Sequence, residues 1–216
     1  MNTKIKYVVI CEVLLGATIL LSQCTGNSKE SEVISSETNP ETVFVANPIL
    51  VEEKSVAKLA IGDAAPPFNL PGIDDQFHKL EDYSDAKILV INFTCNHCPT
   101  AQAYEDRFID VVDDYSGKEV AFVAISANSP IGILPEELGY TDLSDTFVEM
   151  KIRAKDKSYN FPYLYDGDAH EFSLAYGPTA TPHVFVFDKD RKLSYSGRID
   201  ASEKPGTANA EDLRKA

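Results

Sequence analysis

A Cys-x-x-Cys motif at the end of an apolar run constrains the fold of this chain more than any other feature. The run Ile88–Phe93 is typical of a buried strand, and Cys95 and Cys98 follow it, just before a stretch of helical periodicity. The sequence therefore predicts a strand that leads into a helix, with both cysteines on the first helical turn. The unpaired N–H groups there would stabilise a thiolate, and Pro99 costs little at such a position.

Two other interpretations of the cysteine pair have to be weighed. A structural zinc site needs four ligands, and the remaining cysteines, Cys11 and Cys24, fall in a segment of a different kind. Inert buried thiols are not typical of a strand-to-helix junction followed by proline. A redox-active dithiol is favoured, while metal binding by cysteines together with histidines stays open at this point.

The charge of the chain excludes some partners. The formal net charge is −14 over 216 residues, so binding to nucleic acid or to anionic membrane surfaces is disfavoured. The length is sufficient for one globular domain with a sizeable core.

Residues 1–24 are typical of a lipoprotein-type signal peptide. Lys4 and Lys6 precede the apolar stretch Val8–Leu21, which is short for a membrane-spanning helix. The segment ends at Cys24 and resembles a bacterial lipobox, although Gln23 replaces the usual small residue. This resemblance implies lipidation of Cys24, export to the cell envelope or periplasm, and a lipid anchor in a bacterial membrane. An ordinary cleaved signal or a short anchor is the alternative.

The rest of the chain divides into a tether and a domain. Residues 25–54 are polar and without period, as in a linker, and residues 55–216 predict one α/β domain. A hairpin is expected within 61–80, and a strand–helix–strand unit within 87–126 predicts two parallel strands. Further expected elements are helices at 142–158 and 168–176, strands at 161–165, 184–188 and 193–199, and a final helix from residue 211 that the end of the chain cuts short.

Three segments now carry a family resemblance: residues 61–68, residues 93–99 and residues 180–188. Over about residues 55–216 the chain resembles thioredoxin-fold proteins of the redoxin and peroxiredoxin-like branch. The resemblance implies a thioredoxin-like three-layer α/β/α sandwich with a central mixed β-sheet and an N-terminal hairpin extension. It also implies a cis bond between Thr181 and Pro182, lying against the dithiol.

The resemblance further implies thiol–disulfide exchange outside the cytoplasm, in either direction, with protein substrates and a redox partner protein. Cys95, taken as the more exposed sulfur, would attack a substrate disulfide, and Cys98 would resolve the mixed disulfide. His97, between the cysteines, would stabilise a Cys95 thiolate. Asn96, Thr181 and Pro182 are expected as further supporting residues of the site. No cofactor or resident metal is expected.

The chain departs from the thioredoxin pattern at two positions. Thr94 stands where thioredoxins usually have tryptophan, and Asn92 stands where a buried carboxylate would relay protons. Asparagine cannot act as a base, so the sequence does not assign the residue that would relay the proton of Cys98.

Two alternative functions follow from the same residues. One is a peroxiredoxin-like peroxide reductase with Cys98 as the attacking thiol. The other is a Sco-like copper-binding chaperone, for which His183 is the distal ligand candidate. His183 is more simply interpreted as structural, and His78 and His170 as exposed surface residues.

Overall fold

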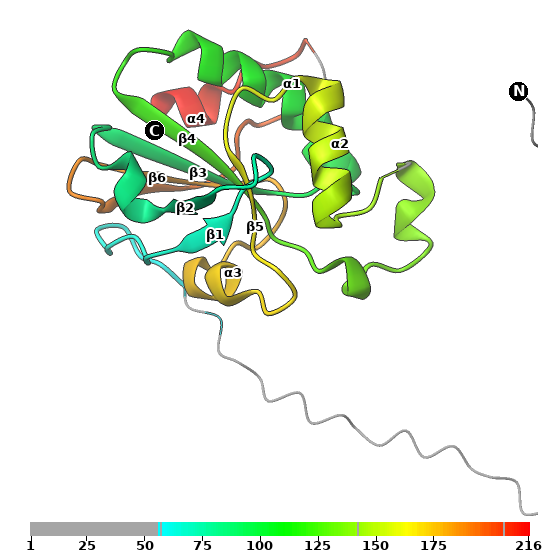
Figure 1. The fold of residues 1–216 in the computed structure, drawn as a ribbon. Coiled ribbons are helices and arrows are strands. Elements are labelled where there is room, and N and C mark those ends of the chain that lie inside the picture. The colour runs from blue at the N-terminus through cyan, green and yellow to red at the C-terminus, as the bar shows by residue number, and fades with distance from the viewer. Residues whose placement is uncertain (1–55, 57, 142, 205) are drawn as a thin grey trace, which may run out of the picture. The chain divides into compact units, whose positions relative to one another are not determined.

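A computed structural model describes residues 56, 58–141, 143–204 and 206–216, which form one α/β domain (Figure 1). The expected signal peptide and tether, including Cys24, lie outside the described residues. Within the described part of the chain, no helix combines the length and the apolar character that crossing a membrane requires.

A five-stranded mixed sheet forms the centre of the domain, in the order β5-β4-β3-β6-β7. Strands β3, β4 and β5 run parallel, whereas β6 is antiparallel to β3 and β7 is antiparallel to β6. The expected parallel unit and the expected late hairpin are thus both confirmed. The strands are β3 Ile88–Thr94, β4 Val120–Ser126, β5 Tyr163–Tyr165, β6 His183–Phe187 and β7 Leu193–Gly197.

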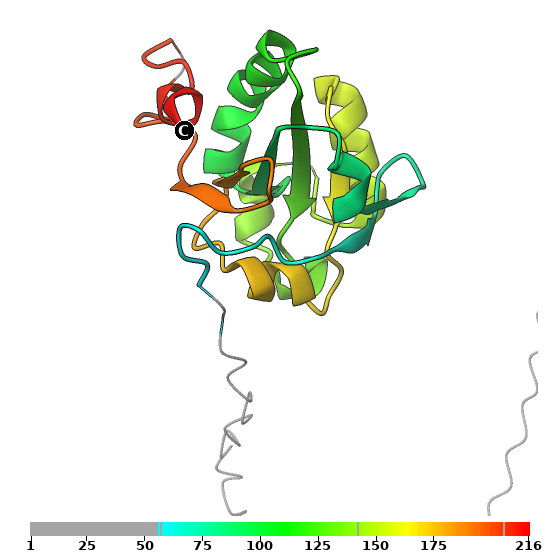
Figure 2. The same cartoon turned by 90° about the vertical axis from the view of Figure 1, so that its left-hand side faces the viewer.

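Helices cover both faces of this sheet, giving the expected three layers (Figures 1 and 2). One face carries α1 Pro99–Asp114, α2 Phe147–Lys157 and α4 Glu211–Lys215. The other carries α3 Glu171–Tyr176 and the antiparallel hairpin of β1 Asn69–Pro71 and β2 Phe77–Lys79. Three short 3-10 helices complete the elements: η1 Leu80–Tyr83, η2 Pro130–Gly132 and η3 Glu137–Tyr140.

Strand β3 explains why the apolar run before the cysteines is continuous. Successive side chains of a strand point to opposite faces, so Val90 packs under α1 while Leu89, Ile91 and Phe93 pack on the opposite side. Because both faces are covered, both sets of side chains have to be apolar. The last residue of β3 is Thr94, and the motif therefore begins where the strand ends.

Two helix starts differ from the expected ones. Helix α1 begins at Pro99, because proline disfavours the helical conformation for the residue before it. Cys98 is accordingly the N-cap, with φ −70° and ψ 120°, and Cys95 lies outside the helix. Helix α2 begins at Phe147 rather than near residue 142, because Thr146 caps it by accepting the N–H of Glu149.

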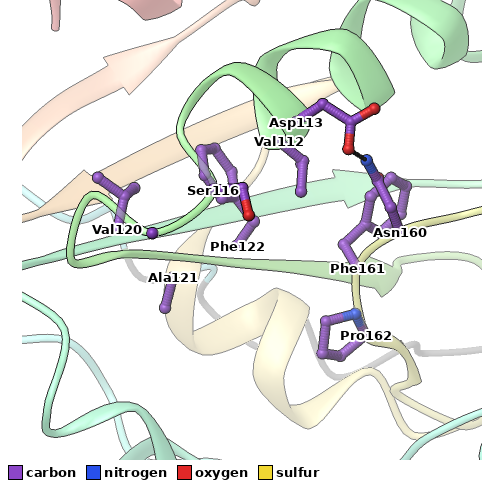
Figure 3. A pocket seen from close by; sticks show the side chains of 10 residues that line it. Val112, Asp113, Ser116, Val120, Ala121, Phe122, Asn160, Phe161 and Pro162 are labelled. Carbon is purple, nitrogen blue, oxygen red and sulfur yellow. Dashed lines mark hydrogen bonds between the residues drawn. The ribbon is translucent and has the colours of Figure 1, made fainter.

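A hollow of about 420 Å³ lies at the far end of α1 from the cysteines (Figure 3). Val112, Phe122 and Phe161 line it, and Asn160 Nδ2 donates to Asp113 Oδ1 across 2.8 Å. No cysteine or histidine contributes to its wall. The chemistry that the sequence predicts has to be sought at the other end of the helix.

Candidate active site

The two cysteines lie at the N-terminal end of α1 and differ in exposure. Cys95 directly follows β3 and is 2% exposed, whereas Cys98, the N-cap of α1, is only half-buried. The expectation that Cys95 is the more exposed sulfur is therefore wrong. The reason is the helix start: Cys95 directly follows the buried strand, and only Cys98 reaches the helix terminus.

The segment before β6 packs against both sulfurs. The peptide bond between Thr181 and Pro182 is cis. Thr181 Oγ1 lies 3.2 Å from Cys95 Sγ, and the carbonyl oxygen of Thr181 lies 3.6 Å from Cys98 Sγ. This contact covers Cys95 and leaves one side of Cys98 open.

The surroundings shift the pKa values of the two thiols in opposite directions. The pKa of Cys98 is lowered to about 5, against burial, first by the hydrogen bond from the Cys95 thiol and then by the N–H groups of Ala101 and Thr100 in the first turn of α1. The same bond to Cys98, together with burial and the charge of Asp145, raises the pKa of Cys95. At neutral pH the stable state of the reduced pair is a Cys98 thiolate beside a protonated Cys95.

Asp145, in the loop before α2, fixes the two residues between the cysteines. Its side chain is fully buried, and Oδ1 accepts the backbone N–H groups of Asn96 at 2.6 Å and of His97 at 3.2 Å. Its other oxygen lies 2.7 Å from His97 Nδ1. Asn96 is itself buried and donates its amide to the carbonyl oxygen of Ser144 at 2.7 Å. The motif is therefore held from outside as well as by α1.

This geometry contradicts the expected role of His97 as the stabiliser of a Cys95 thiolate. The pKa of Cys95 is raised, with the bond to Cys98 and burial as the main causes. His97 Nδ1 is engaged by Asp145. The residues that stabilise a thiolate here act on Cys98.

The donor atoms near the dithiol do not fit a resident metal well. A ring nitrogen of His97, an oxygen of Asp145 and Cys95 Sγ lie within 4.8 Å of one another. However, His97 Nδ1 and both Asp145 oxygens already have protein partners. The group is better described as a hydrogen-bonded His–Asp pair beside a thiol.

His183 has the structural place that its position before β6 suggested. Its Nδ1 accepts the N–H of Thr179 at 3.0 Å, and its Nε2 lies 3.0 Å from Ser196 Oγ. The ring stacks on Phe185 with 4.7 Å between centroids. Since both ring nitrogens are engaged, His183 is unsuited to the copper-ligand role of the Sco-like alternative.

A cavity of about 460 Å³ opens beside Cys98. His97, Asn128, His170 and Thr181 contribute to its lining. A neighbouring hollow of about 260 Å³ shares three of these residues. His170, interpreted from the sequence as an exposed surface residue, is partly exposed at the start of α3 and contributes to both linings.

Asn92 stands where thioredoxins have a buried carboxylate, and an asparagine side chain carries no charge. Asn92 is 4% exposed and its Oδ1 has no hydrogen-bond partner among the described residues. The buried acid of α1 that shares a small internal cavity with it is Glu105. The Glu105 carboxylate accepts two hydrogen bonds from the Arg153 guanidinium, at 2.7 and 2.6 Å, and one from the Tyr159 hydroxyl at 2.6 Å. Both of its oxygens therefore already have hydrogen-bond partners in the fold.

Asp145 and the placement of His170 are the parts of the site that were not predicted from the sequence. The capping pattern of Thr146 and Glu149 was a signal that α2 starts at Phe147, which would have left Asp145 in a loop. No signal in the sequence pairs that loop with His97, 48 residues earlier.

Comparison with known proteins shows to which family the chain belongs. The family model described as the AhpC/TSA family matches residues 61–196, which contain the dithiol, the cis proline and the five central strands except the last residue of β7. The chain belongs to the AhpC/TSA family. Membership in this family supports an oxidoreductase.

Solved structures give the AhpC/TSA chain a consistent set of relatives. An uncharacterized conserved protein from Geobacillus kaustophilus is 35% identical, with a TM-score of 0.63 over 72% of this chain and 78% of that one. A thiol-disulfide oxidoreductase from Bacteroides fragilis (16%, TM-score 0.52, 71% and 98% covered) and Peroxidoxin BcpB from Mycobacterium tuberculosis (17%, 0.53, 73% and 97%) share the fold. No curated protein is significantly similar in sequence.

Proposed function

We propose that this protein is a thiol–disulfide oxidoreductase in which Cys98 attacks and Cys95 resolves. The observation that carries the proposal is the asymmetry of the pair. Cys98 is the more exposed sulfur, caps α1 and has a pKa lowered to about 5, whereas Cys95 is buried and protonated. Thiolates, not thiols, are the nucleophiles of disulfide exchange.

The reaction has two steps. The Cys98 thiolate attacks one sulfur of a substrate disulfide, so that a Cys98–substrate bond forms and one substrate thiolate leaves. Cys95 then loses its proton and attacks Cys98 Sγ, which forms the Cys95–Cys98 disulfide and releases the second substrate thiolate. Two electrons pass from the dithiol to the substrate, and the reverse sequence oxidises a substrate dithiol.

Protein disulfides are the proposed substrates, with a redox partner protein that restores the dithiol or the disulfide. The cavity beside Cys98 is open to solvent, and it is lined by residues that follow β4, by residues of α3 and by the segment from Pro178 to Thr181. A peptide segment that carries a cystine fits such an open, mixed surface better than it fits an enclosed pocket.

The acidity of Cys98 indicates an oxidising pair. A thiolate stabilised in the reduced form disfavours the disulfide, which raises the reduction potential. We expect a potential clearly above about −270 mV, the value of thioredoxin, and nearer to about −120 mV, the value of DsbA. Equilibration with glutathione buffers, followed by alkylation and mass measurement, would give the value, and a potential at or below that of thioredoxin would contradict this direction.

The test of the two cysteine roles is trapping of the mixed disulfide. With an oxidised model peptide, Cys95→Ser should accumulate a covalent adduct on Cys98, because the second step is lost, whereas Cys98→Ser should form none. Both variants are made with Cys11→Ser and Cys24→Ser to remove other thiols. Accumulation in Cys98→Ser instead would assign the attack to Cys95 and overturn the proposal.

Peroxide reduction is a second candidate, favoured by the exposed, acidic Cys98 in an AhpC/TSA family chain. The Cys98 thiolate would take one oxygen from hydrogen peroxide, giving a sulfenic acid and, with a proton, water. Cys95 would condense with the sulfenic acid to the disulfide and a second water. Peroxide turnover with dithiothreitol that survives Cys95→Ser but not Cys98→Ser would support this activity.

We propose that the protein acts in the cell envelope, anchored by a lipid on Cys24. The basic start, the short apolar stretch and Cys24 itself support the proposal. Labelled palmitate should be incorporated when a bacterium expresses the full chain and should be lost with Cys24→Ser. If the wild-type chain carried no label, lipidation of Cys24 would be contradicted. Export without a lipid anchor would then be the alternative.

A further inference from the structure

The second step of the proposed reaction needs a base that the thioredoxin position does not supply. Cys95 has to lose its proton before it can attack Cys98, yet burial, the bond to Cys98 and a neighbouring carboxylate all favour its protonated form. Asn92 cannot accept that proton. Glu105 is engaged by Arg153 and Tyr159.

The residues that do reach Cys95 come from the motif and from the loop before α2. A ring nitrogen of His97 and an oxygen of Asp145 both lie within 4.8 Å of Cys95 Sγ. That separation is within the range that a single bridging water or a small side-chain rotation spans for a general base. The side chain of His97 is only 13% exposed and that of Asp145 is fully buried, so the path is shielded from bulk water.

Asp145 also determines which nitrogen of His97 can act. A carboxylate is only an acceptor, and its two other hydrogen bonds come from backbone N–H groups. The 2.7 Å contact therefore places a proton on His97 Nδ1 and leaves the lone pair on Nε2. His97 is held as a base in one tautomer by a buried carboxylate, which also stabilises the imidazolium that forms.

We infer that His97, positioned by Asp145, is the general base that takes the proton from Cys95 during resolution. The inference rests on the proposed function, because it concerns that reaction's second step. The Cys95 S–H bond breaks, and its proton passes through one bridging water to the unprotonated ring nitrogen of His97, where an N–H bond forms. The Cys95 sulfur then attacks Cys98 Sγ, and the substrate thiolate that leaves takes up the proton from the imidazolium.

This arrangement separates the two halves of the reaction. The first step uses a Cys98 thiolate that already exists at neutral pH, so it needs no base. Only the second step depends on the His–Asp pair. A variant that loses the base should therefore slow resolution and leave the attack by Cys98 unchanged.

The aromatic disulfide DTNB distinguishes these steps, because each step releases one coloured thiolate. The protein is the reduced full chain carrying Cys11→Ser and Cys24→Ser, mixed with DTNB in a stopped-flow instrument. In Asp145→Asn the amide would donate to Nδ1 and place the proton on Nε2, the wrong tautomer for a base. We expect the first release at the wild-type rate and the second slowed by about a hundredfold, within the range of a positioned base.

The pH profile gives a readout that a merely structural role would not change. Other ionisable groups face the pair: Cys98 and Tyr163 beside Cys95, and Glu137 and His170 across the cavities from His97. In the wild-type protein a base held in the site takes the proton, so the second release should depend only weakly on hydroxide concentration. In Asp145→Asn it should keep rising with pH, because only hydroxide or free ionisation of Cys95 is left to remove the proton.

Asp168→Asn is the matched control, since this exposed aspartate near the same loops accepts hydrogen bonds from the hydroxyls of Ser129 and Tyr165 and from no other described residue. It should leave both releases unchanged. If Asp145→Asn fails to fold, as circular dichroism would show, His97→Gln removes the base while keeping the backbone contacts of Asp145, and it should give the same selective loss. A normal second release in folded Asp145→Asn, or in His97→Gln, overturns the inference. Absence of the first release in the wild-type protein would contradict the proposed function instead.

Discussion

The two ends of α1 border hollows of similar size, about 460 Å³ beside Cys98 and about 420 Å³ beside Asp113, yet only one end carries chemistry. At the N-terminal end, unpaired N–H groups favour negative charge and lower the pKa of Cys98. At the C-terminal end, the Asn160 amide donates a hydrogen bond to the Asp113 carboxylate (Figure 3). The size of a hollow does not identify a site; the polarity of the helix end and the residue that caps it do.

The middle of α1 differs from both ends. Glu105 is buried there and binds Arg153 and Tyr159 of the neighbouring helix region, which joins α1 to α2. This network faces the interior rather than either hollow. The helix therefore has a reactive end, a structural middle and an inert end, and each of these assignments is testable by itself.

The largest expected effect is on the acidity of the reactive end. Because its pKa is lowered to about 5, Cys98 should react with iodoacetamide at a nearly constant rate from neutral pH down to about pH 6, and the rate should halve near pH 5. Free cysteine, with a pKa of about 8.5, loses its reactivity far earlier on acidification. The measurement is the alkylation rate at each pH, followed by mass, in the Cys95-containing protein.

The same acidity has a consequence for stability. A lowered pKa stabilises the reduced protein fully only above the unfolded value of about 8.5, and this contribution is lost as the pH falls toward 5. The reduced form should therefore lose stability relative to the disulfide form on acidification through this window. A midpoint of Cys98 alkylation near that of free cysteine would contradict both expectations.

The second effect concerns the structural middle. Glu105→Gln leaves the half-buried Arg153 without its charge partner, and loss of one member of a buried ion pair costs about 3 kcal/mol or more. We expect the urea midpoint to fall accordingly, while the alkylation midpoint of Cys98 stays near pH 5. A shift in that midpoint would mean that the middle and the reactive end are electrostatically coupled.

The sequence was sufficient to predict the N-terminal end of α1 in outline but not in detail. The apolar run of β3, the two cysteines and the Thr181–Pro182 pair predicted the strand, the dithiol and its neighbour, because each is a local pattern. The order of exposure was predicted wrongly, although Pro99 carried the signal: a residue before proline resists the helical conformation, so Cys98 had to be the cap.

Long-range contacts explain the rest of what was missed. Asp145 reaches His97 from the loop before α2, and His170 reaches the same cavity from the start of α3. Their positions depend on how α2 and α3 pack on opposite faces of the sheet, and no periodicity in the chain encodes that packing. A single acidic residue before a helix is far more often a surface residue than the partner of a catalytic histidine.

The smallest expected effect is at the inert end of α1. Asn160 is exposed and donates to Asp113 Oδ1 at 2.8 Å and to the carbonyl oxygen of Ile109 at 3.1 Å (Figure 3). Asn160→Ala removes both bonds but leaves their acceptors accessible to water, so the loss should be about 1 kcal/mol in the free energy of unfolding. Urea unfolding measures that loss, and DTNB reduction should proceed at the wild-type rate in both phases. If the variant instead slowed either phase, the hollow at this end would belong to the function, and the polarity of the helix end would no longer be enough to tell the two hollows apart.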